Sequence, residues 1–192
     1  MQPTLTSERL CLRPFELADA SAVQRLASDA RVALAASTIP HPYPDGAAEA
    51  WISTHADAFA AKREVTFAIT LRDRSELVGA ISLLDISQQH ARGEVGYWTG
   101  VEYWNQGYCT EALVRIIPFA CEELGITKMV ARCSAQNPAS ARVMEKAGLK
   151  REGFLVKHSF KHGRFDDVLI YGLVLPGRGE CGPPPRWSGA PA

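Results

Sequence analysis

The sequence predicts an α+β fold: one mixed, mostly antiparallel sheet of about seven strands with helices on both faces. Segments that alternate polar and apolar residues, as half-buried strands do, are interspersed with segments whose apolar residues recur at helical spacing. In the middle of the chain one helix separates two strands, which predicts that these two strands are parallel neighbours. The early strands are expected to form an antiparallel meander.

The first half of the chain is expected to hold one strand, two helices and a hairpin. The helix nearest the N-terminus would bury Leu17, Ala20, Val23, Leu26 and Ala27 on one face. The prolines of residues 39–44 disfavour helix before each of them, and Asp45 is expected to cap the next helix. The predicted elements are a strand over 9–13, a helix over about 16–30, a helix from Asp45 to about Phe59, and strands over 65–71 and 77–84 around a turn at Asp73–Ser75.

The second half alternates strands and helices before a closing pair of strands. The turn between the closing strands is expected at His162-Gly163-Arg164. The predicted elements are a strand over 94–100, a helix over about 107–124, a strand over 128–133, a helix over 138–147, and two closing strands of which the last covers 168–175.

Composition and charge suit one soluble domain. The chain has 192 residues, of which 46% are hydrophobic and 22% charged, enough for one sizeable core. Acidic and basic residues both number 21, which argues against nucleic acid or an anionic membrane as the main partner. The domain is expected to span residues 1–175, and the Gly/Pro-rich residues 176–192 to form a flexible tail.

The five cysteines and the N-terminus predict a cytoplasmic protein. The cysteine count is odd and no two are spaced CxxC, so neither a disulfide framework nor a zinc site is expected. The histidines show no ligand spacing either, so no metal is expected. The first ten residues lack an apolar signal core, and no run reaches about 18 apolar residues.

A strand, a loop containing Gly107 and a helix form the strongest local motif. The first turn of a helix offers unpaired N–H groups and a favourable dipole to an anion, and glycine lets a phosphate approach the backbone closely. Alone, the motif is a weak signal for an anion site, because many strand–helix joints contain one glycine; the plainer alternative is an ordinary helix start in which Thr110 is the N-cap and Glu111 complements the dipole.

Two longer segments, Tyr103–Ala112 and Asn137–Leu149, resemble the GNAT superfamily of acetyl-CoA-dependent N-acetyltransferases. Gly107 takes the central glycine of the family's loop motif and Cys109 the following small-residue place, whereas the motif's first position falls near Trp104 and does not match. Gly96-Tyr97-Trp98, the Asn137 segment and residues 163–167 are similar to the branch that acetylates the N-terminal alanine or serine of ribosomal proteins. The resemblance covers roughly residues 4–175.

The resemblance implies a sheet that is splayed at the CoA site, with acetyl-CoA as cosubstrate. The pantetheine arm would lie in the splay as a surrogate strand, because its amides can satisfy unpaired backbone groups there. Asn137 is expected to contact CoA, although Asn-Pro is also an excellent helix N-cap. The implied cofactor-binding residues are Gln106, Gly107, Tyr108, Cys109 and Thr110 at the pyrophosphate, Trp98, Thr99, Gly100 and Val101 along pantetheine, and Asn137 and Ser140.

The catalytic candidates are Glu94 and Ser140. The acceptor amine must lose a proton before it attacks the thioester, and the family often places a glutamate on this strand to take that proton through water. The alternative for Glu94 is a solvated carboxylate paired with Arg92 or another cation. Family members that protonate the CoA thiolate with a tyrosine have it where this chain has Met144, so the resemblance assigns the acid or thiol-binding role to Ser140.

Other candidates have plainer explanations. The ribosomal branch's glutamate base falls at about Ser159 here. A cysteine at a helix N-terminus has a lowered pKa, but Cys109 has no histidine in its motif, so covalent catalysis is disfavoured. The segment His41–Tyr43 borders the acceptor cleft in the family, and turn-forming prolines explain it equally well.

The sequence thus predicts an acyltransferase that moves acetyl from acetyl-CoA directly to a primary amine in a ternary complex. The expected acceptor is the N-terminal α-amine of a protein or peptide. The alternatives are a small-molecule amine, such as an aminoglycoside, polyamine or amino acid, and a non-catalytic acyl-CoA-binding module. Neither nucleic acid nor membrane is expected as a partner, and the chain is expected to be a monomer or homodimer.

Overall fold

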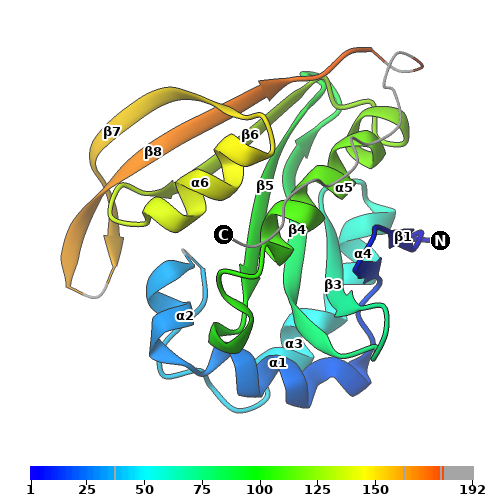
Figure 1. Ribbon diagram of the computed structural model, residues 1–192, viewed down its shortest axis with the longest axis vertical. Coiled ribbons are helices and arrows are strands. Elements are labelled where there is room, and N and C mark those ends of the chain that lie inside the picture. Colours follow the sequence, from blue (N-terminus) through cyan, green and yellow to red (C-terminus); the bar gives the residue numbers. More distant parts are fainter. Residues whose placement is uncertain (37, 162, 178, 180–192) are drawn as a thin grey trace.

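The computed structural model describes residues 1–36, 38–161, 163–177 and 179, which form one eight-stranded mixed sheet with helices on both faces (Figure 1). The strand order is β1-β2-β3-β4-β5-β6-β8-β7, and only β5 and β6 pair in parallel. This confirms the predicted fold class. The strands are β1 Leu5–Thr6, β2 Leu10–Arg13, β3 Val65–Leu71, β4 Leu77–Ser87, β5 Arg92–Thr99, β6 Lys128–Ser134, β7 Lys150–Lys161 and β8 Arg164–Val174.

The helices divide between the two faces of the sheet. Phe67 of β3 packs edge-on against Phe119 of α5 on the face that also carries α6 (Figure 1). Alternate residues of the strands point to the opposite face, which the N-terminal helices cover. On that side, Trp98 of β5 and Trp51 of an N-terminal helix line one cavity. The helices are α1 Ala20–Ala27, α2 Ala30–Ala35, α3 Ala47–Ser53, α4 His55–Ala60, α5 Tyr108–Glu122 and α6 Pro138–Lys146, with 3₁₀ turns at Leu17–Asp19 and Val101–Tyr103.

The sheet splays between β5 and β6. These strands pair only over Arg92–Val95 and Lys128–Ala131. Beyond that point β5 stays with β4 as far as Thr99, while β6 stays with β8 as far as Ser134. The strands therefore diverge directly before the loop that leads into α5, as the family resemblance implied.

The N-terminal helices differ from the prediction. The helix expected over 16–30 is a 3₁₀ turn followed by α1, and Leu17 is 64% exposed rather than buried. A separate helix, α2, begins because the Asp29 side chain accepts a hydrogen bond from the Arg31 N–H. The N-cap of α3 is Gly46, at φ +76°, and not Asp45.

One further helix boundary was wrong, and one short strand was not predicted. The helix expected to run to Phe59 is interrupted at Thr54, whose hydroxyl donates to the Trp51 carbonyl and competes with the regular ladder. The sheet has an eighth strand, β1, which at two residues is too short to show alternation. His162 of the predicted turn, and residues 178 and 180–192 of the predicted tail, lie outside the described residues.

Across the described ranges, no helix has the length and apolar character needed to cross a membrane.

Candidate functional site

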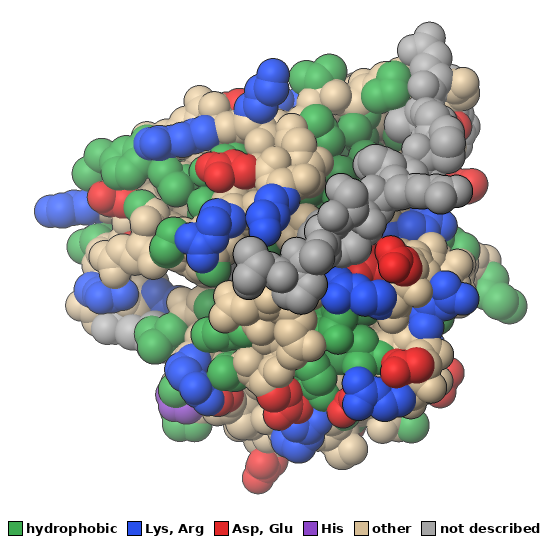
Figure 2. Space-filling model, viewed as in Figure 1, with side chains coloured by type: hydrophobic (Ala, Val, Ile, Leu, Met, Phe, Trp, Pro, Cys, Tyr) green, Lys and Arg blue, Asp and Glu red, His purple; other side chains and the backbone are tan. Residues whose placement is uncertain are grey.

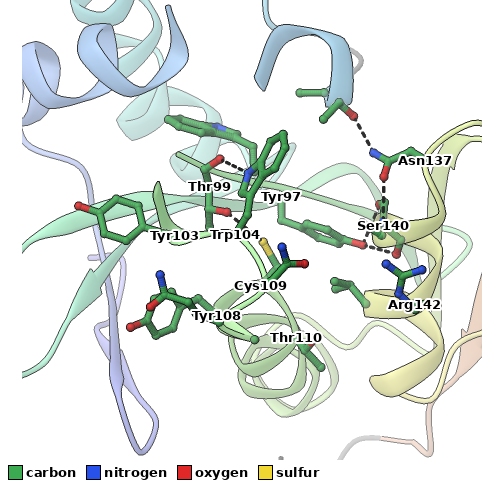
Figure 3. Close-up of a pocket in the computed structure, with 18 of the residues that line it drawn as sticks. Tyr97, Thr99, Tyr103, Trp104, Tyr108, Cys109, Thr110, Asn137, Ser140 and Arg142 are labelled. Carbon is green, nitrogen blue, oxygen red and sulfur yellow. Dashed lines mark hydrogen bonds between the residues drawn. The ribbon is translucent and has the colours of Figure 1, made fainter. Parts of the chain in front are cut away.

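Two cavities lined by described residues meet at the splay. The loop cavity, of about 430 Å³, lies between the end of β5, the loop before α5, and α6 (Figure 3). The sheet cavity, of about 740 Å³, lies over β4, β5 and β6 and is bordered by the segment after α2 and by the β7–β8 hairpin. Both are lined by Ala35, Ala36, Tyr97, Trp98 and Ser140. The two cavities are therefore adjacent, and these five residues can contact a ligand in either one.

The loop cavity contains the start of α5. Gly107 is the N-cap at φ +80°, a left-handed conformation that glycine adopts without strain. The helix begins at Tyr108, so the alternative in which Thr110 is the N-cap was wrong. The first-turn N–H groups have no partner within the helix, and all five residues predicted at the pyrophosphate, 106–110, line the cavity. This geometry suits an anion.

The loop is held by a buried carboxylate that the sequence analysis placed only near the helix dipole. Glu111 is 2% exposed. Its Oε1 accepts from the Ser7 hydroxyl at 2.7 Å and the Arg9 N–H at 2.8 Å, and its Oε2 accepts from Arg9 Nε at 2.7 Å. The same guanidinium donates to the Gln106 carbonyl at 3.1 Å and lies 4.8 Å from the centre of the Tyr108 ring. The segment before β2 thereby fixes the loop from behind.

Two basic residues that the sequence analysis did not select also line the loop cavity. Arg142 and Lys146 lie four residues apart on α6, and Arg142 projects toward the start of α5 in Figure 3. The sequence does contain a signal for these two residues: they are four positions apart in the helix after Asn137, and residues i and i+4 lie on the same helix face. They bring positive charge to a cavity that already has a helix N-terminus.

Asn137 caps α6 and also reaches α2. Its Oδ1 accepts from the Ser140 N–H at 3.0 Å, and its Nδ2 donates to the Ala35 carbonyl at 3.2 Å. The capping alternative is therefore confirmed. Because Asn137 also lines the loop cavity, the predicted CoA contact stays a prediction.

Ser140 has a partner that sequence reasoning missed. The Tyr97 hydroxyl lies 3.0 Å from Ser140 Oγ and 3.0 Å from the Ser140 carbonyl oxygen (Figure 3). Burial raises the pKa of Tyr97 above its ordinary value, so the phenol keeps its proton. In the sequence, Tyr97 stands out only as part of the motif Gly96-Tyr97-Trp98. Nothing in that motif shows that the Tyr97 side chain meets a residue 43 positions later.

Cys109 is a protonated thiol in this environment. Burial raises its pKa to about 11, whereas a helix N-terminus alone would lower it. The thiol donates to Thr99 Oγ1 at 3.8 Å. A nucleophilic role therefore has no support from the geometry.

The four residues predicted along pantetheine separate into two pairs. Trp98 and Thr99 line the loop cavity, and the Trp104 indole N–H donates to the Thr99 carbonyl at 3.0 Å. Gly100 and Val101 lie outside its lining. The Gly100 N–H donates to the Val78 carbonyl at 2.9 Å, so that group is already paired.

Glu94 lies in the sheet cavity as one half of an ion pair. Its carboxylate accepts from two nitrogens of Arg132, with Nε at 2.9 Å, and its side chain is 21% exposed. The cation is thus Arg132 and not Arg92. Ser159 and Met144 line the same cavity, Met144 as a fully buried core residue, and further carboxylates there are Glu64 and Asp85.

The sequence and the fold were compared with known proteins. Residues 9–150 match the family model described as the acetyltransferase (GNAT) domain. An uncharacterized N-acetyltransferase of Bacillus subtilis, YoaA, is 30% identical over 176 residues, which cover 92% of this chain and 99% of that protein. The ribosomal-protein-serine acetyltransferase of Escherichia coli is 30% identical over 100 residues, 52% of this chain and 56% of that protein.

A solved structure of RimL, a ribosomal L7/L12 alpha-N-protein acetyltransferase in complex with coenzyme A, has the same fold. Its TM-score is 0.83 at 18% identity, and the match covers 90% of this chain and 98% of RimL.

Proposed function

The chain belongs to the GNAT acetyltransferase family, and we propose that it transfers acetyl from acetyl-CoA to the N-terminal α-amine of a protein or peptide. The family membership makes it an acetyl-CoA-dependent N-acetyltransferase. The acceptor and the residue roles are our proposal.

The observation that carries the proposal is the meeting of the two cavities at Tyr97 and Ser140. Acetyl-CoA would occupy the loop cavity, with its pyrophosphate on the first-turn N–H groups of α5 and its thioester near Ser140. The acceptor amine would occupy the sheet cavity and reach the thioester from the other side. Both substrates would then be bound at once, so the amine attacks the acetyl carbonyl directly and no acyl-enzyme is needed.

The roles of Ser140 and Glu94 follow from where they lie. Ser140 lines both cavities, so its hydroxyl could donate to the departing CoA thiolate. The Tyr97 hydroxyl has one proton, which it can donate either to the Ser140 carbonyl or to Ser140 Oγ. If it donates to Oγ, the serine proton is free for the sulfur. If it donates to the carbonyl, the Oγ contact requires the serine to donate to Tyr97. Glu94, on the acceptor side, would take the amine proton through water while Arg132 orients its carboxylate.

An α-amine fits this catalytic apparatus. Its reference pKa is about 8, so it needs less help from a base than a lysine amine at about 10.4. The base available is a carboxylate that already shares its charge with Arg132. The Escherichia coli relative acts on ribosomal protein, which supports a protein N-terminus as the acceptor.

A second candidate acceptor is a small cationic amine. Glu64 and Asp85 line the sheet cavity beside the Glu94–Arg132 pair, and their charge would favour a second positive group on the acceptor.

A CoA-release assay with three acceptors tests the proposal. The acceptors are a peptide with a free N-terminal serine or alanine, the same peptide N-blocked but containing lysine, and a linear polyamine. We expect release with the first peptide and little with the second. Preferred turnover of the polyamine would favour the small-molecule acceptor, and no release with any amine would overturn both.

A further inference from the structure

One lysine joins the two walls of the sheet cavity. Lys161, the last residue of β7, directs its ammonium group at the C-terminal end of α2. There Nζ donates to the carbonyls of Ala33 at 2.7 Å, of Ala36, and of Ile39 at 3.3 Å. All three donors of the ammonium are used on backbone oxygens.

The C-terminal end of a helix stabilises a bound cation such as the Lys161 ammonium group. The last carbonyls of a helix have no partner within it and carry the negative end of its dipole, so a cation there is stabilised. Among the described residues no salt bridge joins Lys161 to a carboxylate. The hydrogen bonds of the Lys161 ammonium group are thus to carbonyls at and just after the end of α2, which lie 122 to 128 positions earlier in the sequence.

The position of the contact matters more than its strength. Ala35, Ala36 and Ile39 line one side of the sheet cavity, and His158, Ser159 and Val168 of the β7–β8 hairpin line the other. The hairpin tip reaches toward α2 in Figure 1, and Figure 2 shows the surface hollowed between them. Lys161 lies on the same strand as His158 and Ser159, and its ammonium group is bonded to Ala36 and Ile39 of the opposite lining.

We propose that Lys161 latches the β7–β8 hairpin onto α2 and thereby sets the width of the sheet cavity, so that it determines which acceptors fit. The role in specificity rests on the proposed function, which makes the sheet cavity the acceptor site. With the latch closed the cavity admits a narrow group, such as an unbranched amine or the end of an extended chain. A wider acceptor would have to break three hydrogen bonds to enter.

Cavity width can be measured without turnover through Cys133, a buried residue that lines the sheet cavity. Full-length protein is treated with N-ethylmaleimide, and the alkylation rate of each cysteine is read by peptide mass spectrometry. Lys161→Met is compared with Lys150→Met, the same change at an exposed lysine on the same strand. Cys121, a buried residue of α5 that lines neither cavity, reports any general loosening.

We expect Lys161→Met to speed alkylation of Cys133 by about tenfold and to leave Cys121 unchanged, since opening of the latch is local. The ratio of kcat/KM for an unbranched amine to that for an amine branched beside its nitrogen should fall by a similar factor. Lys150→Met should change neither. An unchanged Cys133 rate, an equal acceleration at Cys121, or an unchanged ratio would each overturn the proposal. If wild type acetylates no amine while Cys133 still becomes accessible, the acceptor proposal fails and the latch itself stands.

Discussion

The loop cavity and the sheet cavity are held together by different kinds of contact. Behind the loop cavity, the Glu111 carboxylate is 1% exposed and takes three hydrogen bonds from Ser7 and Arg9. In the sheet cavity, the Arg132 and Glu94 side chains of the corresponding pair are 43% and 21% exposed. The cavity proposed for the cosubstrate is thus supported by a buried carboxylate with three hydrogen bonds, and the cavity proposed for the acceptor contains a partly exposed ion pair.

Under the proposed function, this difference separates the support of the acetyl-CoA site from the side chains that would select the acceptor. A diphosphate is bound by backbone N–H groups whose positions require a rigid loop. An acceptor is selected by side chains and by a hairpin, which can change without disturbing the loop.

The largest expected effect is on the loop cavity's support. Glu111→Ala should lower the free energy of unfolding by about 3 kcal/mol, because the Ser7 hydroxyl, the Arg9 N–H and Arg9 Nε all lose their buried acceptor. Glu94→Ala is the matched control and should cost less than about 1 kcal/mol. Urea denaturation measures both. Equal losses would remove the distinction between the two cavities.

Acid should destabilise the fold through His55. His55 is buried against Phe15 and Trp51, and burial lowers its pKa to about 4. The folded protein thus keeps this imidazole neutral. The contribution of neutral His55 to the free energy of unfolding is therefore fully present above the unfolded-state pKa of about 6.5. It is lost as the pH falls below that value, by about 2 kcal/mol between pH 7 and pH 5.

His55→Phe should reduce that loss, measured as the change in unfolding free energy between pH 7 and pH 5. The His55 ring nitrogens have no hydrogen-bond partner within the described structure, so the substitution removes no such bond. Replacement of the exposed His90 by Phe should leave the pH dependence as in wild type. The same dependence in His55→Phe and wild type would refute this origin of acid sensitivity.

Where the cavities meet, Ser140→Ala should lower kcat about tenfold, a modest loss because the CoA thiolate is already a fair leaving group. Tyr97→Phe should have a similar effect, because the Ser140 hydroxyl loses the partner that orients its proton toward the sulfur. The double variant should be no worse than Ser140→Ala alone, since Tyr97 would act only through Ser140. Steady-state kinetics on the four proteins tests this. Multiplicative losses would mean that Tyr97 does not act through Ser140.

The smallest expected effect concerns the base. Glu94→Gln should lower kcat by about fivefold for an α-amine acceptor, because that amine is already partly deprotonated near neutral pH. The KM for acetyl-CoA should stay the same, as Glu94 does not line the loop cavity. Asp85→Asn, a change to another carboxylate of the sheet cavity, is the control. An equal loss in both variants would make the effect one of general charge.

The sequence predicted the parts of the fold that depend on local pattern. Strand β3 was predicted at its observed bounds because its apolar and polar residues alternate throughout, and the loop before α5 was found through Gly107, whose left-handed φ is a local requirement. The break at Thr54 and the cap at Gly46 were missed because side-chain hydrogen bonds and turn geometry decide them.

The acceptor side was less predictable because its contacts span long distances in sequence. Glu94 meets Arg132 across 38 positions, and Tyr97 meets Ser140 across 43. No periodicity links such residues, since the parallel pairing of β5 with β6 brings Glu94 to Arg132, and the packing of α6 near the splay brings Ser140 to Tyr97.

A crystal structure with coenzyme A bound tests the central claim most directly. The pyrophosphate oxygens should lie within about 3.2 Å of backbone N–H groups among residues 107–110, with the CoA sulfur beside Ser140. A pyrophosphate bound elsewhere, or a sulfur directed away from the junction of the two cavities, would contradict the account.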